Sequence, residues 1–176
     1  MKALGHVVSG LTIDVDQGHV AAILLKPIPS NLKELQSFLG FIGYYRQHIK
    51  DYALIAGPLT KLLSPKVVFE MTQERVKAYK ELVKIVTNAP FLFHANPDKP
   101  YILYVDACMD GLGAALHQQQ IFDDKPIEGP ICFISRKLKD SEMRYGGTQL
   151  ECLSLVWALE KLYYYLDGAQ FEVITD

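Results

Sequence analysis

The chain has few of the residues that often identify a protein class at once. Its 176 residues include only three cysteines, Cys108, Cys132 and Cys152. Their odd number and the lack of a CxxC pair argue against a disulfide framework and against a cysteine-based zinc site. Because each lies in an apolar stretch, we expect all three to be buried, reduced thiols.

Long apolar runs and a strong excess of one charge are also missing. No stretch approaches the roughly 18 apolar residues that span a bilayer, and the first ten residues, MKALGHVVSG, lack the apolar core of a secretory signal. The sequence therefore predicts an intracellular protein without a membrane partner. The formal net charge of -2 excludes a protein that coats nucleic acid with its whole surface, while a local basic face stays open.

What is present is the composition of an ordinary globular chain, with 49% hydrophobic and 22% charged residues. The first half has helical periodicity, interrupted where Pro27 and Pro29 must end a helix. Asn31 and Glu34 have the spacing of a capping box at the start of the next helix. We expect an all-helical first half with helices over residues 16–26, from Asn31 to about Ile49, from Tyr52 to Leu63 and from Thr72 to Thr87.

After the Pro- and Asn-rich boundary NAPFLFHANPDKP, the pattern changes from helical to alternating. Three strands follow, YILYVDAC, GLGAALHQQ and PICFISRKL, joined by MDG and by the polar segment IFDDKPIEG, and a meander is their natural pairing. A helix from about Ser141 or Thr148 to Leu166 leads to a last strand, FEVITD. A helical crossover favours parallel pairing of this strand with the first. The sequence therefore predicts an α+β or α/β fold with a mixed sheet in its second half.

Three acids stand out against this apolar pattern. Asp106 interrupts a strand that should be central and shares a face with Tyr104. Glu151 falls one turn before Leu155, on the helix face that should pack on the sheet. Asp176 ends the strand expected beside Asp106. Burial of a lone ionised acid costs several kcal/mol, so each acid should be paired, neutralised or bound to a cation.

Each acid alone has an ordinary explanation as a solvated or strand-end residue. Together, the central strand, the crossover helix and the parallel neighbour can bring them to one edge of the sheet. The lysines that could neutralise them are poorly placed, since Lys137 and Lys139 lie in the outer strand region and Lys161 is more than two helical turns from Glu151. Clustered carboxylates without cysteine or histidine partners favour magnesium or manganese.

The chain resembles the polyproteins of gypsy-class LTR retrotransposons, close to those of fungi. The resemblance rests on five segments in this order and spacing: LGHVVSGLTID, SNLKELQSFLGFIGYYRQHIKDYALIAGPLTKLL, TNAPFLFHANPDKPYILYVDAC, DGLGAALHQ and YGGTQLECLSLVWALEKLYYYLDGAQFEVITD. It implies that residues 1–65 correspond to the thumb end of a reverse transcriptase, 66–98 to a connecting segment, and 99–176 to the N-terminal part of a ribonuclease H domain.

By this resemblance, Asp106, Glu151 and Asp176 match three of the four carboxylates with which such a domain holds two magnesium ions. The implied activity is two-metal hydrolysis of the RNA strand of an RNA–DNA hybrid, in the cytoplasm, a retroelement particle or the nucleus. We expect the chain to stop before the fourth acid, so that activity is weak and residues 171–176 self-associate through a bare strand edge. The polymerase carboxylates lie outside the matching segments, so no polymerase activity is implied.

The helix that begins at Asn31 carries a second group of candidates. Lys33, Arg46, Lys50 and Tyr44 are the candidate nucleic-acid-binding residues, because the family's thumb tracks the duplex and such side chains contact phosphate and sugar. The alternative is an ordinary solvated helix face over a core of leucine and phenylalanine.

Two other functional hypotheses remain open. The first is a catalytically inactive nucleic-acid-binding or structural remnant, in which three acids bind metal weakly. The second is a nucleotide-binding domain of the actin and sugar-kinase type, which the segment VDACMDGLGAAL resembles in outline, although such folds need two lobes and a longer chain. Metal-dependent cleavage of a hybrid separates the ribonuclease H hypothesis from the first, and nucleotide affinity would support the second.

Overall fold

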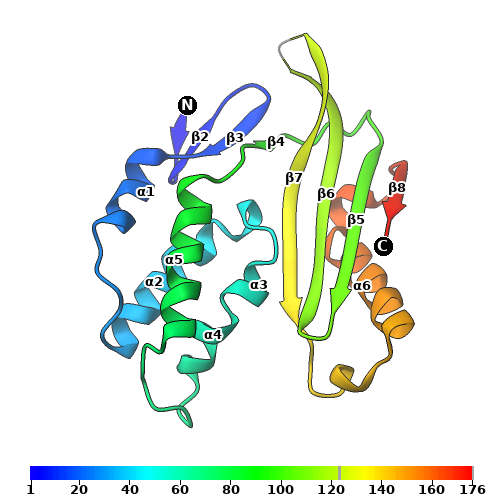
Figure 1. Cartoon of the computed structure of the whole chain (residues 1–176). Coiled ribbons are helices and arrows are strands. Elements are labelled where there is room, and N and C mark those ends of the chain that lie inside the picture. Colours follow the sequence, from blue (N-terminus) through cyan, green and yellow to red (C-terminus); the bar gives the residue numbers. More distant parts are fainter. Residues whose placement is uncertain (123, 176) are drawn as a thin grey trace.

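The computed structural model describes residues 1–122 and 124–175 and has two four-stranded sheets (Figure 1). The first sheet consists of β1 (Lys2–Ala3), β2 (His6–Val8), β3 (Thr12–Val15) and β4 (Leu92–Phe93), in that order. The second has the order β7-β6-β5-β8, from β5 (Tyr101–Cys108), β6 (Gly111–Phe122), β7 (Lys125–Lys137) and β8 (Phe171–Ile174).

The helices lie between and beside these sheets. They are α1 (Gln17–Leu24), α2 (Leu32–Tyr44), α3 (Tyr52–Ile55), α4 (Gly57–Thr60), α5 (Gln73–Thr87), α6 (Gly147–Lys161) and α7 (Tyr163–Leu166). Short 3-10 helices occur at η1 (Arg46–His48), η2 (Lys61–Leu63) and η3 (Glu142–Arg144). Within the part of the chain that the structure describes, no helix combines the length and the apolar character needed to cross a bilayer.

The predicted helices of the first half are present, but the prediction that this half is all-helical is wrong. Asn31 caps α2 as expected, since its side chain accepts a hydrogen bond from the Glu34 backbone N–H at 3.0 Å. The strands β1 to β3 precede α1, and β4 from the boundary segment completes their sheet by pairing with β3. Strands of two to four residues carry too few alternations to be seen in a sequence, and the β3–β4 pairing joins residues about 80 positions apart.

The predicted mixed sheet is confirmed. β5, β6 and β7 form an antiparallel meander, and α6 leads to β8, which pairs in parallel with β5. The long hairpin differs from the prediction, because β6 and β7 continue through most of the polar segment expected to be a loop. Gln118 and Gln120 stay in the strand because their buried amides donate to backbone carbonyls, including that of His94 at 2.6 Å.

Helix α6 covers one face of this sheet, behind the strands in Figure 1. Trp157 lies in the core between them, beneath the guanidinium group of Arg136 at 5.6 Å. Arg136 also donates two hydrogen bonds to Glu142, at 2.6 and 3.0 Å, and holds the pKa of that carboxyl at about 2. This ion pair fixes the connection between β7 and α6.

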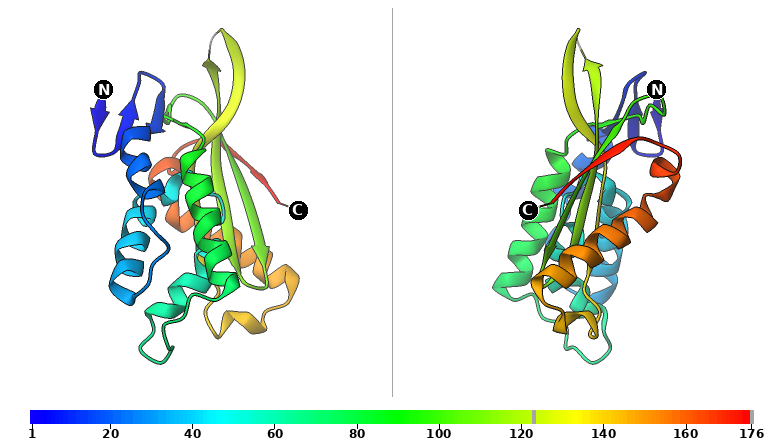
Figure 2. Two further views of the ribbon diagram at one scale, coloured as in Figure 1. Left: turned by 60° about the vertical axis from the view of Figure 1, so that its left-hand side comes forward. Right: turned by 90° about the vertical axis from the view of Figure 1, so that its right-hand side faces the viewer.

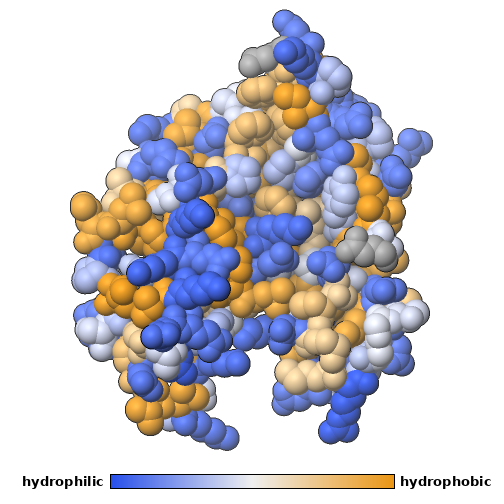
Figure 3. All heavy atoms as spheres, in the orientation of Figure 1, coloured by the Kyte–Doolittle hydropathy of each residue, from blue (hydrophilic) through white to orange (hydrophobic). Residues whose placement is uncertain are grey.

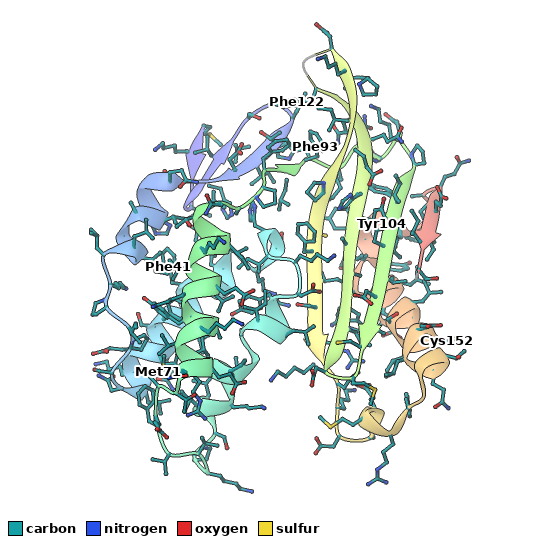
Figure 4. The ribbon with its side chains drawn as sticks, in the orientation of Figure 1. Phe41, Met71, Phe93, Tyr104, Phe122 and Cys152 are labelled. Carbon is teal, nitrogen blue, oxygen red and sulfur yellow. The ribbon has the colours of Figure 1, made fainter. Side chains whose placement is uncertain are left out.

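The prediction of three buried thiols is correct for only one cysteine. Cys132 is buried in the second core, and this burial raises its pKa to about 12. Cys108 and Cys152 are exposed, and Figure 4 shows Cys152 on the outer side of α6. Both lie on the solvent side of their elements, because the apolar neighbours that suggested burial occupy the opposite faces.

The helical half packs against β7 from the side opposite to α6 in the views of Figures 1 and 2. Near the start of α3, the backbone N–H of Ala53 donates to the Ser135 hydroxyl of β7 at 2.9 Å. At the other end, the Phe93 ring lies against Gly129, and Phe93 and Phe122 meet edge to face at 6.1 Å (Figure 4). These contacts join the two halves along one strand.

Replacing Gly129 by alanine should destabilise the chain. A Cβ at this position would lie 2.3 Å from a ring carbon of the buried Phe93, and relief of such overpacking costs about 1–3 kcal/mol. Gly40→Ala is the matched control, because nothing lies within 4 Å of a Cβ there and alanine favours the interior of α2. Urea denaturation followed by circular dichroism should show a lower midpoint for Gly129→Ala only; an unchanged midpoint would contradict this packing.

Candidate active site

Asp106 lies near the end of β5, which is central in the sheet as predicted. Tyr101, Leu103 and Val105 are buried on the α6 side, whereas Asp106 is exposed. The alternation places Asp106 on the opposite face together with Tyr104, also as predicted. Its direct partner across the β5–β6 ladder is Gly113.

A groove of about 500 Å³ opens on this face of the sheet. Its floor and walls come from both halves of the chain: Tyr104, Asp106 and Phe133 from the sheet, Lys50 and Asp51 from the loop after η1, and Pro90 from the boundary segment. The hydrogen bond of His48 just before this loop anchors it to the boundary segment: His48 is buried, and its Nδ1 lies 3.1 Å from the Pro90 carbonyl oxygen.

Asp51 brings a second carboxylate into this groove. Its backbone is left-handed, with φ of 56°, a conformation that aspartate tolerates better than most residues. Its side chain occupies the space above Gly113, where a Cβ would lie 2.8 Å from the Asp51 Oδ1 atom. Burial raises the pKa of Asp51, and the charge of Asp106 raises it further while Lys50 lowers it. Burial is therefore the main cause of the raised pKa, and the nearby charge of Asp106 adds to it.

The opposite wall of the groove is aromatic and fixed by a single carboxylate oxygen. Tyr104 donates its hydroxyl hydrogen to Glu128 Oε1 at 2.8 Å, and His117 Nδ1 lies 2.9 Å from the same atom. The hydrogen bond to Glu128 raises the pKa of Tyr104 and lowers that of Glu128. Tyr104 and His117 meet edge to face at 4.9 Å, so the two rings hold each other in place.

The expected burial of Glu151 is wrong. The buried stripe of α6 is formed by Leu150, Ser154, Trp157 and Ala158, and Glu151 is exposed beside it. One residue corresponds to 100° around a helix, so the neighbour of a buried leucine lies off the stripe. Asp106 is exposed as well, and the argument that lone buried acids need partners therefore does not apply to either residue.

The third predicted acid, Asp176, lies outside the described residues. The β5–β8 ladder is described as far as the pair Tyr104 and Ile174, and both strands run toward the edge where Asp106 lies. Within residues 1–122 and 124–175, no three acidic, histidine or cysteine side chains form a group that could hold a metal ion. The convergence of the three acids thus stays a prediction.

The four candidate nucleic-acid-binding residues do not form one patch. Lys33 lies in the first turn of α2, roughly 16 Å along the helix from Tyr44. Tyr44 donates to the Leu4 carbonyl oxygen and packs on the His6 ring. Arg46 is exposed in η1, and Lys50 lines the groove beside Asp106. Of the four, Lys50 is nearest to the candidate active site, and the binding role of the set stays a prediction.

Sequence reasoning did not single out Asp51 or His117 as part of a site. The position of Tyr104 two residues before Asp106 was a usable signal, because residues i and i+2 of a strand share a face. No local pattern connects Asp51 with Asp106, since 55 positions separate them and only tertiary packing brings them together.

A meander, a crossover helix and a parallel fourth strand define this sheet as ribonuclease H-like. Residues 71–173 match the model of the RNase H-like domain found in reverse transcriptase. The chain belongs to this family.

The similarity to retrotransposon polyproteins extends over nearly the whole chain and confirms the resemblance. The Pol polyproteins of the transposons 297 and gypsy of Drosophila melanogaster are each 36% identical to it, over 98% and 100% of its length. The Tf2-3 polyprotein of Schizosaccharomyces pombe is 28% identical over 100% of the chain. The chain spans 16%, 18% and 13% of the lengths of these three relatives.

Solved structures of a foamy viral protease-reverse transcriptase share the fold. The structure in complex with double-stranded DNA has a TM-score of 0.78 at 20% identity and covers 98% of this chain and 37% of that one. The structure with an RNA/DNA hybrid has a TM-score of 0.74 at 20% identity, covering 97% of this chain and 24% of that one. At this identity the likeness shows the fold alone.

Replacing Asp51 by asparagine tests whether folding raises the pKa of this acid. Burial raises the pKa of Asp51 above its ordinary value of 3.8 in the folded state, so the contribution of this carboxyl to stability falls as pH rises above 3.8. Asparagine keeps the size and tolerates the left-handed backbone but carries no charge. The variant should therefore be more stable than wild type at pH 7, with a difference that shrinks as pH falls toward 3.8.

The measurement is urea denaturation at several pH values, with the exposed Asp140→Asn as the control for loss of one negative charge. A pH-independent difference between wild type and Asp51→Asn, or an equal effect in the control, would show that folding does not raise the pKa of Asp51.

Proposed function

We propose that the chain is the part of a retrotransposon reverse transcriptase that binds an RNA–DNA hybrid and hydrolyses its RNA strand with magnesium or manganese. The observation that carries this proposal is the place of Asp106, exposed at the end of the central strand of a ribonuclease H-like sheet and open to a groove. The foamy viral structures with the same fold were solved with double-stranded DNA and with an RNA/DNA hybrid, which supports a nucleic acid duplex as the partner.

Asp106, Glu151 and Asp176 are the residues that would hold two magnesium ions. The donor chemistry fits, because carboxylate oxygens are the preferred ligands of magnesium and both described acids are exposed to solvent. The bound ions would supply the activation of water and the stabilisation of the leaving oxygen. Lys50 is placed to neutralise a phosphate at the groove, and contacts to the 2′-hydroxyl would select RNA over DNA.

A second candidate is a remnant that binds nucleic acid without turnover. In such a remnant Asp106 and Glu151 would bind metal too weakly for hydrolysis. Self-association through residues 171–176 also stays a prediction; β8 pairs with β5 along one side, and no other described strand pairs with it. An intracellular site of action, in the cytoplasm, a particle or the nucleus, is part of the same proposal.

Cleavage of a labelled RNA–DNA hybrid tests the proposal. With magnesium or manganese the wild-type chain should cut the RNA strand and leave a DNA duplex intact. Asp106→Asn should lower the rate by more than the roughly 100-fold that loss of an outer metal partner costs, because it removes a direct ligand. Asp110→Asn, in the exposed turn after β5, is the matched control and should cut normally.

Two results would contradict this proposal, the first the activity and the second the assigned site. Binding of the hybrid without cleavage in either metal would favour the inactive remnant. Cleavage that survives Asp106→Asn would place the active site elsewhere. The same variants also allow a readout without turnover, since a metal that binds only the folded state should raise the thermal midpoint of wild type but not of Asp106→Asn.

A further inference from the structure

Helix α5 carries a row of lysines that neither the fold nor the proposed active site uses. Lys77, Lys80 and Lys84 are exposed and lie within about 60° of one another around the helix axis. The buried residues Ala78 and Leu82 lie on the other side of the helix, against the helical core. The three lysines therefore form a stripe that points away from the protein, and we call it the α5 stripe.

The α5 stripe has no anionic partner among the described residues. None of its three ammonium groups lies within 4.0 Å of a carboxylate there. Like charges three and four residues apart destabilise a helix, by about 0.2–0.5 kcal/mol for each pair. Glu81 is the single acid in the shallow hollow of about 640 Å³ that the three lysines line, so the formal charge of that hollow is three minus one, or +2.

The α5 stripe lies on the side of the molecule to which the candidate active site opens. Figure 1 shows α3 between α5 and β7, with α6 behind the sheet, and Figure 3 shows hydrophilic side chains gathered along α5 on the same face. Figure 4 shows Met71, which lines the hollow, near the beginning of this helix. Lys50 lies in the loop between η1 and α3 and lines the groove beside Asp106, so the helical half places a cation at the groove as well as on α5.

The dimensions of the α5 stripe suit a polynucleotide strand. Seven residues separate Lys77 from Lys84, which corresponds to about 10 Å along a helix. One strand of a duplex advances about 3.4 Å per nucleotide, so the stripe matches about three nucleotides. Flexible ammonium groups bind phosphates as point charges without reading bases.

We propose that the α5 stripe binds the sugar–phosphate backbone of the RNA–DNA hybrid and directs that duplex toward the groove at Asp106. This inference rests on the proposed function, since it names the surface that holds the same substrate. It moves the main phosphate contact from Lys33, Arg46 and Lys50, which are dispersed over α2, η1 and the next loop, to α5, where three lysines lie in one row.

The salt dependence of binding tests this assignment, because each phosphate contact releases counterions. Affinity for a fluorescent hybrid is measured by anisotropy in EDTA, so that no strand is cut, across a series from about 50 to about 200 mM salt. In the triple variant Lys77→Gln, Lys80→Gln and Lys84→Gln, the slope of log K against log salt should decrease by about 2 to 3. The triple variant with arginine at the same positions should keep the wild-type slope, because it keeps the charge.

The control is a second triple variant with the same loss of charge at exposed lysines elsewhere, Lys66→Gln, Lys125→Gln and Lys161→Gln. Its slope should change by less than about 1. Wild-type binding with equal slopes in both glutamine variants would overturn the α5 assignment and leave hybrid binding intact. A wild-type chain that does not bind the hybrid would overturn the proposed function together with this inference. A parallel series with duplex DNA should give the same difference between the variants, since backbone phosphates carry the contact.

Discussion

The contact between the loop after η1 and strand β7 determines the shape of the groove. The hydrogen bond from the Ala53 backbone to Ser135 fixes where α3 begins, and the residues just before it bring Asp51 over Gly113. Gly113 permits this approach because it has no Cβ, and it is the ladder partner of Asp106. The sheet therefore supplies most of the surroundings of Asp106, and the helical half adds Lys50 and Asp51.

Acidic and basic side chains occupy separate places on one face of the molecule. Two acids, Asp51 and Asp106, line the groove, where burial and, to a smaller extent, the charge of Asp106 raise the pKa of Asp51. Cations gather on the outward side of α5, where Lys77, Lys80 and Lys84 lie in one row. The formal net charge of -2 sums 18 basic and 20 acidic residues over the whole chain and therefore does not show this division. Under the proposed function, a polyanion would bind on α5 while its reacting phosphate meets Asp106 at the sheet.

Much of the second half could be predicted from its sequence. The alternation in β5 gave the face of Asp106, and the crossover helix gave the parallel pairing of β8. The helices of the first half were also accessible, because Asn31 and the prolines mark their ends. These predictions succeed for one physical reason. The hydrogen bonds of a helix or strand, and the face to which each side chain points, depend on residues close by in the sequence.

The remainder depends on tertiary packing. The first sheet was not predicted because its strands are short and because β4 pairs with β3, which is far away in the chain. The face of Glu151 was misjudged because α6 is apolar on several sides, so that the pattern alone did not show which stripe packs on the sheet. Asp51 enters the groove only because the helical half docks on β7.

Because both halves contact β7, we expect them to unfold as one cooperative unit. The single tryptophan, Trp157, reports on the second core, whereas α2 and α5 contribute much of the helical signal. Urea denaturation followed by Trp157 fluorescence and by far-ultraviolet circular dichroism tests this expectation directly. Coincident transitions with one midpoint are the expected result. If the helical signal is lost at a lower urea concentration than the Trp157 signal, the halves unfold separately and the helical half cannot define the groove at Asp106.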